Sequence, residues 1–103
     1  MSVPIEINYL DPNKPRGNVG GVPSVRVGES FHVFSHDGPL KFSFKGDSPF
    51  AQDTGELPGG DVDHFPTKPG RYKFACRIHV NGRDIELDPD APEGPGGEME
   101  VIP

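Results

Sequence analysis

The sequence of 103 residues contains a single cysteine, no tryptophan and only 32% hydrophobic residues. One cysteine excludes an internal disulfide framework, so the fold has to rest on packing. No apolar run approaches the ~18–20 residues that a membrane-spanning helix needs. Long helices are excluded as well, because 14 glycines and 13 prolines divide the chain and the longest stretch without either is Arg71–Asn81. What is present is aromatic: seven phenylalanines and two tyrosines supply enough buried area for one small core.

Basic residues are missing from the end of the chain. The formal net charge is −6, and no Lys or Arg follows Arg83. Such a chain has no phosphate-binding footprint, so we expect neither a nucleic acid nor a membrane as partner. A basic protein partner or a cation stays open. The first ten residues lack the basic and apolar regions of an export signal, which predicts a cytoplasmic protein, or a periplasmic one if a signal has been trimmed.

Hydrophobic and polar residues alternate along most of the chain, between turns rich in Gly, Pro and Asp. This pattern predicts an all-β fold: an antiparallel Greek-key β-sandwich of seven to eight strands, in a single domain over residues 1–103. An acidic loop rich in Pro and Gly is expected at about residues 88–97. The strands are expected near residues 3–9, 22–27, 30–35, 40–45, 61–65, 71–80, 83–87 and 98–102.

Asn81-Gly82 is the most informative turn in the sequence, because Asn-Gly between two alternating segments favours a two-residue type I′ hairpin. That turn sets the register of the two strands. It places His79 opposite Asp84 and Arg77 opposite Glu86 on one face, as pairs of opposite charge. The other face then carries the apolar residues Tyr72, Phe74, Cys76, Ile78, Ile85 and Leu87.

Three segments resemble the cupredoxin family of blue copper proteins: Val25–Phe31, Pro69–His79 and Gly97–Val101. The most specific of them is the strand with Cys76 and His79, which is similar to the family's Cys-x-x-His ligand pair. The resemblance implies an eight-stranded Greek-key sandwich, and a one-electron carrier in those members that bind copper. It makes Cys76 and His79 candidate copper ligands, with His36 as the nearest candidate for the family's first histidine.

The chain departs from this family in the other ligands. A blue copper site takes two imidazoles, a thiolate and a weak axial ligand such as Met. The first histidine of the family aligns near Leu40, four residues after His36, and Met99 lies in an expected core strand. In the hairpin register, moreover, Cys76 and His79 face opposite sides of the sheet. We therefore predict a cupredoxin-like domain without a complete type 1 copper site and without a cofactor, acting as a non-catalytic binding or accessory module.

Several alternatives remain at this point. One is a copper-binding electron carrier that uses Cys76, His79 and a displaced His36; another is a redox-sensing thiol at Cys76 alone. His32, His36 and His64 with a carboxylate would suit zinc or iron. No phosphate loop, nucleophile elbow or catalytic triad is present, so an enzyme is not expected.

A protein partner is expected to contact the loop of residues 46–60 or the acidic segment of residues 84–93. The oligomeric state is open, and so is weak Ca²⁺ binding by the acidic segment. The candidate contact residues in that segment are Asp84, Glu86, Asp88 and Asp90.

Overall fold

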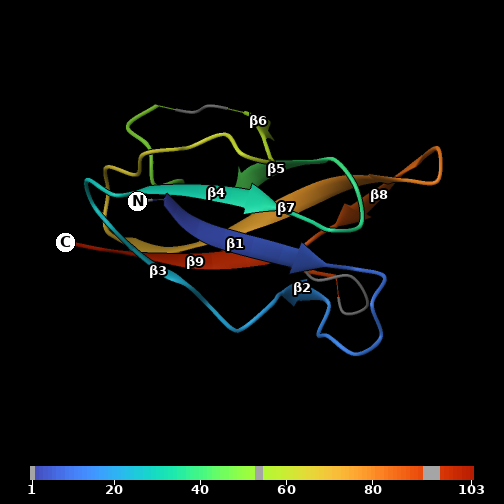
Figure 1. Cartoon of the computed structure of the whole chain (residues 1–103). Helices are drawn as coiled ribbons and strands as arrows, with labels where there is room; N and C mark the ends of the chain where they lie inside the picture. Colours follow the sequence, from blue (N-terminus) through green and yellow to red (C-terminus); the bar gives the residue numbers. More distant parts are fainter. Residues whose placement is uncertain (1, 53–54, 92–95) are drawn as a thin grey trace.

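The computed structural model describes residues 2–52, 55–91 and 96–103, and these residues form nine strands and no helix. This confirms the predicted all-β class. Nothing in the described part of the chain is a helix of the length and apolarity needed to cross a membrane. The strands are β1 (Ser2–Asn8), β2 (Gly17–Asn18), β3 (Ser24–Arg26), β4 (Ser30–Phe34), β5 (Leu40–Lys45), β6 (Leu57–Pro58), β7 (Gly70–Val80), β8 (Arg83–Leu87) and β9 (Gly97–Ile102) (Figure 1).

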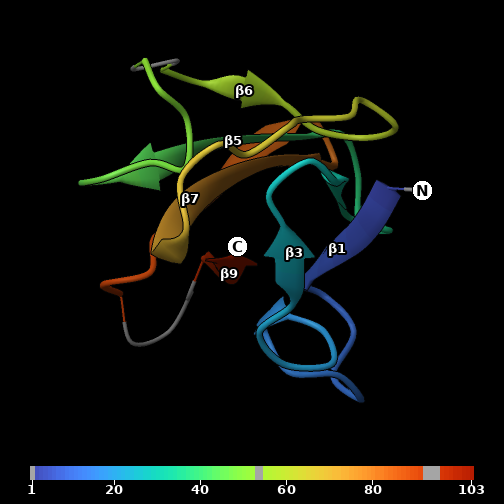
Figure 2. The same ribbon diagram turned by 90° about the vertical axis from the view of Figure 1, so that its left-hand side faces the viewer.

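The strands form two sheets that pack against each other. The smaller sheet has the order β2-β1-β4, and the larger has the order β3-β9-β7-β5-β6. β7 is the longest strand, and one of its edges pairs with β5. The opposite edge is shared by β9, which pairs with residues 70–74, and β8, which pairs with residues 76–80. Figure 2 shows that the larger sheet is curved, with β7, β5 and β6 bending around the side on which β1 lies.

The expectation that all strands are antiparallel is wrong. β1 pairs with β4 in parallel, and β3 pairs with β9 in parallel, so both sheets are mixed. A parallel pair needs a long crossover rather than a tight turn. Residues 9–29 supply it between β1 and β4 and contribute β2 and β3 on the way, while β3 and β9 are separated by most of the chain.

The alternation of β5 and β7 builds the core between the sheets. Phe42 of β5 and Phe74 of β7 are buried, with ring centroids 5.4 Å apart, and Phe31 of β4 packs on Phe42 from the other sheet at 6.3 Å. Full burial of one such side chain stabilises a fold by ~1.5–3 kcal/mol. Lys41 and Lys45 alternate with these rings and stay exposed. The predicted wet and buried faces of this strand are confirmed.

Gly97, at the start of β9, lets that strand approach the core closely. A Cβ atom at this position would overlap the ring of Phe74, which is fully buried and has no room to move. Glycine here therefore serves a close approach of backbone to ring rather than a turn.

One of the expected strands does not match the described segments, and one expected loop lies partly outside them. The strand expected near residues 61–65 is reduced to one bridge, in which His64 and Phe31 exchange backbone hydrogen bonds of 2.8 and 2.9 Å. Asp61, Asp63 and Phe65 around it are exposed, so no second buried face extends the pairing. The acidic loop expected at about 88–97 is only partly described, because residues 92–95 lie outside the described residues.

Candidate functional site

The hairpin of β7 and β8 has the register that the sequence predicts. Val80 pairs with Arg83, and the pairing continues residue by residue to Cys76 and Leu87. Asn81 has φ of 50° and Gly82 has φ of 77°, which are the positive values that a type I′ turn requires. Every residue of this hairpin is therefore assigned to one of two faces, and that assignment decides which side chains can meet.

Cys76 lies on the core face of the hairpin. It is 2% exposed and pairs with Phe42 on one side and Leu87 on the other. Burial raises the pKa of its thiol from the ordinary value of 9.0 to about 12, although the Gly97 backbone partly offsets the shift. The thiolate is the reactive and metal-binding form of cysteine. At neutral pH this side chain is a small apolar core residue, as free cysteines commonly are.

His79 lies on the opposite face of the same strand. Its side chain is 56% exposed, and its Nδ1 lies 3.0 Å from Oδ1 of Asp84. His36 lies beyond the end of β4 in the smaller sheet, with a side chain 72% exposed and its Nε2 3.8 Å from Oε1 of Glu6. The structure therefore does not bring Cys76, His79 and His36 together: one is in the core and the other two are on the surface.

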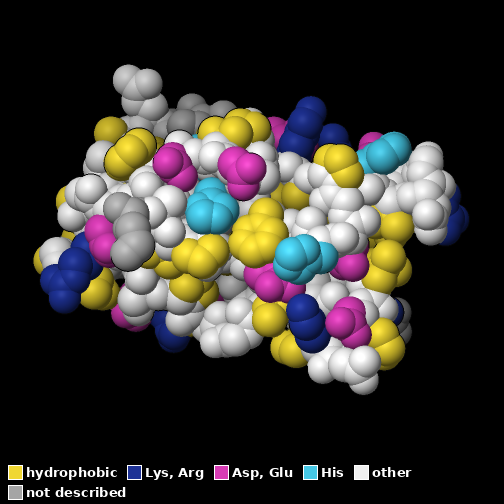
Figure 3. Space-filling view, viewed as in Figure 1, with side chains coloured by type: hydrophobic (Ala, Val, Ile, Leu, Met, Phe, Trp, Pro, Cys, Tyr) yellow, Lys and Arg dark blue, Asp and Glu magenta, His cyan; other side chains and the backbone are white. Residues whose placement is uncertain are grey.

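The remaining histidines also have partners of their own. The Nδ1 atom of His32 lies 2.8 Å from the Ser2 hydroxyl and 3.9 Å from Asp63. The Nε2 atom of His64 lies 2.9 Å from the carbonyl oxygen of Pro58. Within the described residues, no three His, Cys, Asp or Glu side chains are grouped so that they could hold a metal ion. Figure 3 agrees: on the face it shows, the histidines lie apart.

The four acidic candidates lie in a row along and beyond β8, and each contacts a basic side chain of the larger sheet. Oε1 of Glu86 accepts a hydrogen bond of 3.2 Å from Arg77, as predicted, while Asp84 pairs with His79. Asp88 and Asp90 both contact Lys45 at the end of β5, at 2.8 and 3.4 Å. Lys45 donates hydrogen bonds to Asp88, which lowers the pKa of that carboxyl and raises the pKa of the lysine.

The outer face of the larger sheet separates charges by strand. Bases occupy the central strands β5 and β7, and acids occupy β8 and β9 beside β7. Cross-strand neighbours therefore carry opposite charge where β7 meets β8 and β9, whereas Lys41–Arg77 and Lys45–Lys73, between β5 and β7, are pairs of like charge. Arg71, for example, lies 3.9 Å from Glu98 and 3.7 Å from Glu100. The bases are Lys41, Lys45, Arg71, Lys73 and Arg77; the acids are Asp84, Glu86, Glu98 and Glu100.

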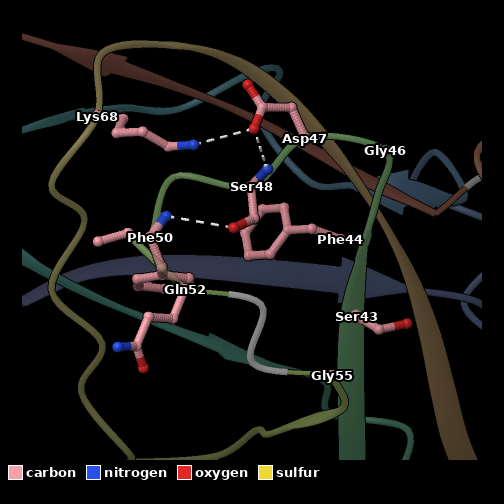
Figure 4. Close-up of a pocket in the computed structure, with 10 residues that line it drawn as sticks. Ser43, Phe44, Gly46, Asp47, Ser48, Phe50, Gln52, Gly55 and Lys68 are labelled. Carbon is pink, nitrogen blue, oxygen red and sulfur yellow. Dashed lines mark hydrogen bonds and ion pairs between the residues drawn. The ribbon is translucent and has the colours of Figure 1, made fainter.

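The loop of residues 46–60, the other expected contact segment, borders an open hollow of about 260 Å³ (Figure 4). Lys68 donates a 3.0 Å hydrogen bond to Asp47, and this pairing lowers the pKa of the carboxyl. The ring of Phe50 packs edge-on against Phe44, 5.8 Å away. The two charged groups in the described lining, Asp47 and Lys68, thus pair with each other.

Sequence reasoning did not identify the role of Lys45. The alternation of residues 40–45 places this lysine on the wet face, but only the tertiary fold brings it to Asp88 and Asp90. Comparison of the chain with protein-family models, with curated proteins and with solved structures gave no match.

Proposed function

We propose that this protein is a cupredoxin-like domain without a complete type 1 copper site, and that it acts as a non-catalytic binding module. Its contact surface is the charged outer face around β7 and β8, where Asp84 and Glu86 lie on β8 and Asp88 and Asp90 follow it. The proposal includes a Greek-key connection of the two sheets, as the cupredoxin resemblance implies.

The observation that carries the proposal is the opposite orientation of the two best copper candidates. Cys76 is 2% exposed on the core face, whereas the side chain of His79 is 56% exposed on the outer face. Both lie on one continuous strand, so neither can reach the other's side without breaking the pairing with β8. With its thiol pKa at about 12, Cys76 offers no thiolate at neutral pH. The exposed charged residues of the outer face then favour a function in binding a partner.

The positions of the resembling segments support the cupredoxin part of the proposal. Residues 25–31 lead through the Gly28 turn into β4, and residues 69–79 make up most of β7. Residues 97–101 make up most of β9, which pairs antiparallel with β7. The three segments thus meet around one core, where β3 pairs with β9 and β9 pairs with β7.

A titration with Cu(II), followed by visible absorption, separates this function from that of a copper electron carrier. The binding module should give no intense thiolate-to-copper absorption band, either as wild type or as Cys76→Ala. A band in the wild type that disappears in Cys76→Ala would mean that Cys76 leaves the core to bind copper. The proposed function would then be wrong, and His36 would be the next residue to substitute.

Binding itself is tested by NMR with ¹⁵N-labelled protein and three sets of extended synthetic peptides, one cationic, one anionic and one neutral. The acidic surface predicts that the cationic peptides shift the amide resonances of residues 84–90 and that the anionic ones do not. If the resonances of other residues shifted first, the contact surface would lie elsewhere on the protein. No response to any set, with the fold intact, would contradict a binding function of this face.

A further inference from the structure

β8 has a free edge. It pairs with β7 along five residues, and within the described parts of the chain no other strand pairs with it. Four other strands end the sheets in sheet order, and β2, β3 and β6 have only two or three residues each. The fourth, β4, has five residues, but its outer edge is occupied: Phe31 exchanges backbone hydrogen bonds with His64, and the carbonyl oxygen of Val33 accepts one from Gly60. The edge of β1 next to β2 is longer but contains Pro4, which has no N–H to offer. Among the described strands, β8 therefore has the longest edge that is unpaired and contains no proline.

The hairpin register shows which backbone groups point out of this edge. In a two-residue hairpin the residues that flank the turn form a hydrogen-bonded pair, so Val80–Arg83 is bonded and His79–Asp84 is not. The N–H of His79 accordingly points away from β8 and donates to the carbonyl oxygen of Pro39, 2.9 Å away. By the same alternation, the N–H and C=O groups of Asp84 and Glu86 point away from β7, toward the free edge.

The side chains at the same two positions specify the charge of a ligand. Asp84 uses Oδ1 for His79, and Glu86 uses Oε1 for Arg77. The second carboxylate oxygen of each has no partner in any described residue. These side chains are 59% and 71% exposed, so a base on an adjacent strand could reach both of them.

Ile85, between the two acids, faces the other side of the sheet and is partly buried against the core. An incoming strand would place alternate residues on these two sides. Its matching pattern is therefore basic, apolar, basic, with the apolar residue beside Ile85.

A second copy of this chain is a poor occupant for the same reason. Two β8 strands that pair antiparallel about Ile85 would put Asp84 of each opposite Glu86 of the other. Like charges directly opposite each other destabilise a strand pair. Charge complementarity thus favours a different, basic chain.

We propose that the free edge of β8 binds an extended basic segment of a partner protein as an added strand, with Lys or Arg at alternate positions. The inference rests on the proposed binding function and names its partner class. Backbone hydrogen bonds to Asp84 and Glu86 hold the segment, and the two carboxylates select its charge.

The test uses a capped, dye-labelled peptide of about eight residues in which Lys and Val alternate. Binding is followed by fluorescence anisotropy at low salt. Two further versions carry N-methyl groups, one on every Lys amide and the other on every Val amide. The two sets of amides lie on opposite edges of an extended strand, so strand addition predicts that one version loses binding and the other keeps it. Equal behaviour of the two would overturn the inference.

Two charge-matched double variants test the location. Asp84→Asn with Glu86→Gln should weaken binding of the unmethylated peptide by about tenfold. Glu98→Gln with Glu100→Gln removes the same charge from β9, which already pairs with β3 and β7, and should change binding by less than about twofold. Equal effects of the two double variants would also overturn the inference.

The two proposals fail in different ways. Cationic peptides that bind with no preference between the methylated versions would overturn strand addition and leave the binding function intact. A copper–thiolate band, or no peptide response of any kind by NMR, would contradict the binding function itself, and strand addition would fail with it.

Discussion

At the scale of single residues, the decisive feature is that one strand carries two potential ligands into different environments. Cys76 is surrounded by Phe42, Leu87 and the backbone of Gly97, whereas three residues later His79 stands in solvent beside Asp84. The spacing of Cys76 and His79 in the sequence suggests a pair of metal ligands. In a strand, however, residues three positions apart point to opposite faces. For the two residues of a Cys-x-x-His motif to bind one metal ion, the strand has to end between them. Here β7 continues through Val80.

The buried thiol should make the stability of the protein depend on pH in alkaline solution. The pKa of Cys76 is about 12 in the fold, against 9.0 as its ordinary value, so the unfolded chain loses this proton first. Its contribution to stability is complete below pH 9 and is lost as the pH rises through 12, by at most about 1.4 kcal/mol per pH unit. Urea unfolding of wild type and Cys76→Ala between pH 7 and pH 10.5 measures this.

The variant isolates the thiol from the lysines and tyrosines that titrate in the same range. The free energy of unfolding of the wild type should fall relative to that of Cys76→Ala above pH 9, and not below it. A constant difference across the range would mean that the thiol ionises in the fold as it does in water. Fast reaction of native Cys76 with a thiol reagent at pH 7 would point the same way.

At the scale of elements, the hairpin of β7 and β8 is the part of the fold that local sequence determines. Asn tolerates positive φ better than most residues and Gly does so freely, so Asn81-Gly82 favours the type I′ turn, in which both central residues have positive φ. The turn sets the register, and the register makes both the charged pairs and the apolar face. Because the register depends on the turn, its stability can be tested at a single position.

Asn81→Val should destabilise the protein by about 1 kcal/mol or more, since a β-branched residue is strained at φ of 50°. Asn81→Gly, which removes the same side chain but permits the conformation, is the matched control and should stay within about 0.5 kcal/mol of the wild type. Thermal and urea unfolding measure both. If Asn81→Val were as stable as the control, the chain would turn elsewhere, and the parity argument against copper would lose its basis.

The contrast between features set by local sequence and contacts between distant segments explains how much could be predicted from the sequence. The hairpin, the wet and buried faces of β5 and the core position of Cys76 follow from alternation and turn chemistry, and each is confirmed. The parallel pairing of β1 with β4 and of β3 with β9 was not predicted, because nothing local marks it. The link from Lys45 to Asp88 and Asp90 escaped for the same reason: it joins segments more than forty residues apart.

At the scale of the whole molecule, charge and sheet edges act together. The net charge is −6, and the free edge of β8 carries two of the acids. Charged side chains on an edge strand oppose pairing with a further copy, because each added strand would bring like charges together. On this view Asp84 and Glu86 have two effects: they keep β8 unpaired in the absence of a ligand, and they favour a basic strand when one is present.

Replacing both acids by threonine, as Asp84→Thr with Glu86→Thr, should therefore make the protein self-associate. Threonine suits a strand and removes the repulsion, while the outward N–H and C=O groups of β8 remain. Sedimentation velocity over a range of concentrations should show dimers or larger species that the wild type lacks.

The control is Glu98→Thr with Glu100→Thr, which lowers the negative charge equally on β9, a strand that pairs with β3 and β7. Because β9 has no comparable free edge, this variant should sediment as the wild type does. Association of both variants would assign the effect to net charge alone, and association of neither would mean that the edge of β8 is not accessible to a strand.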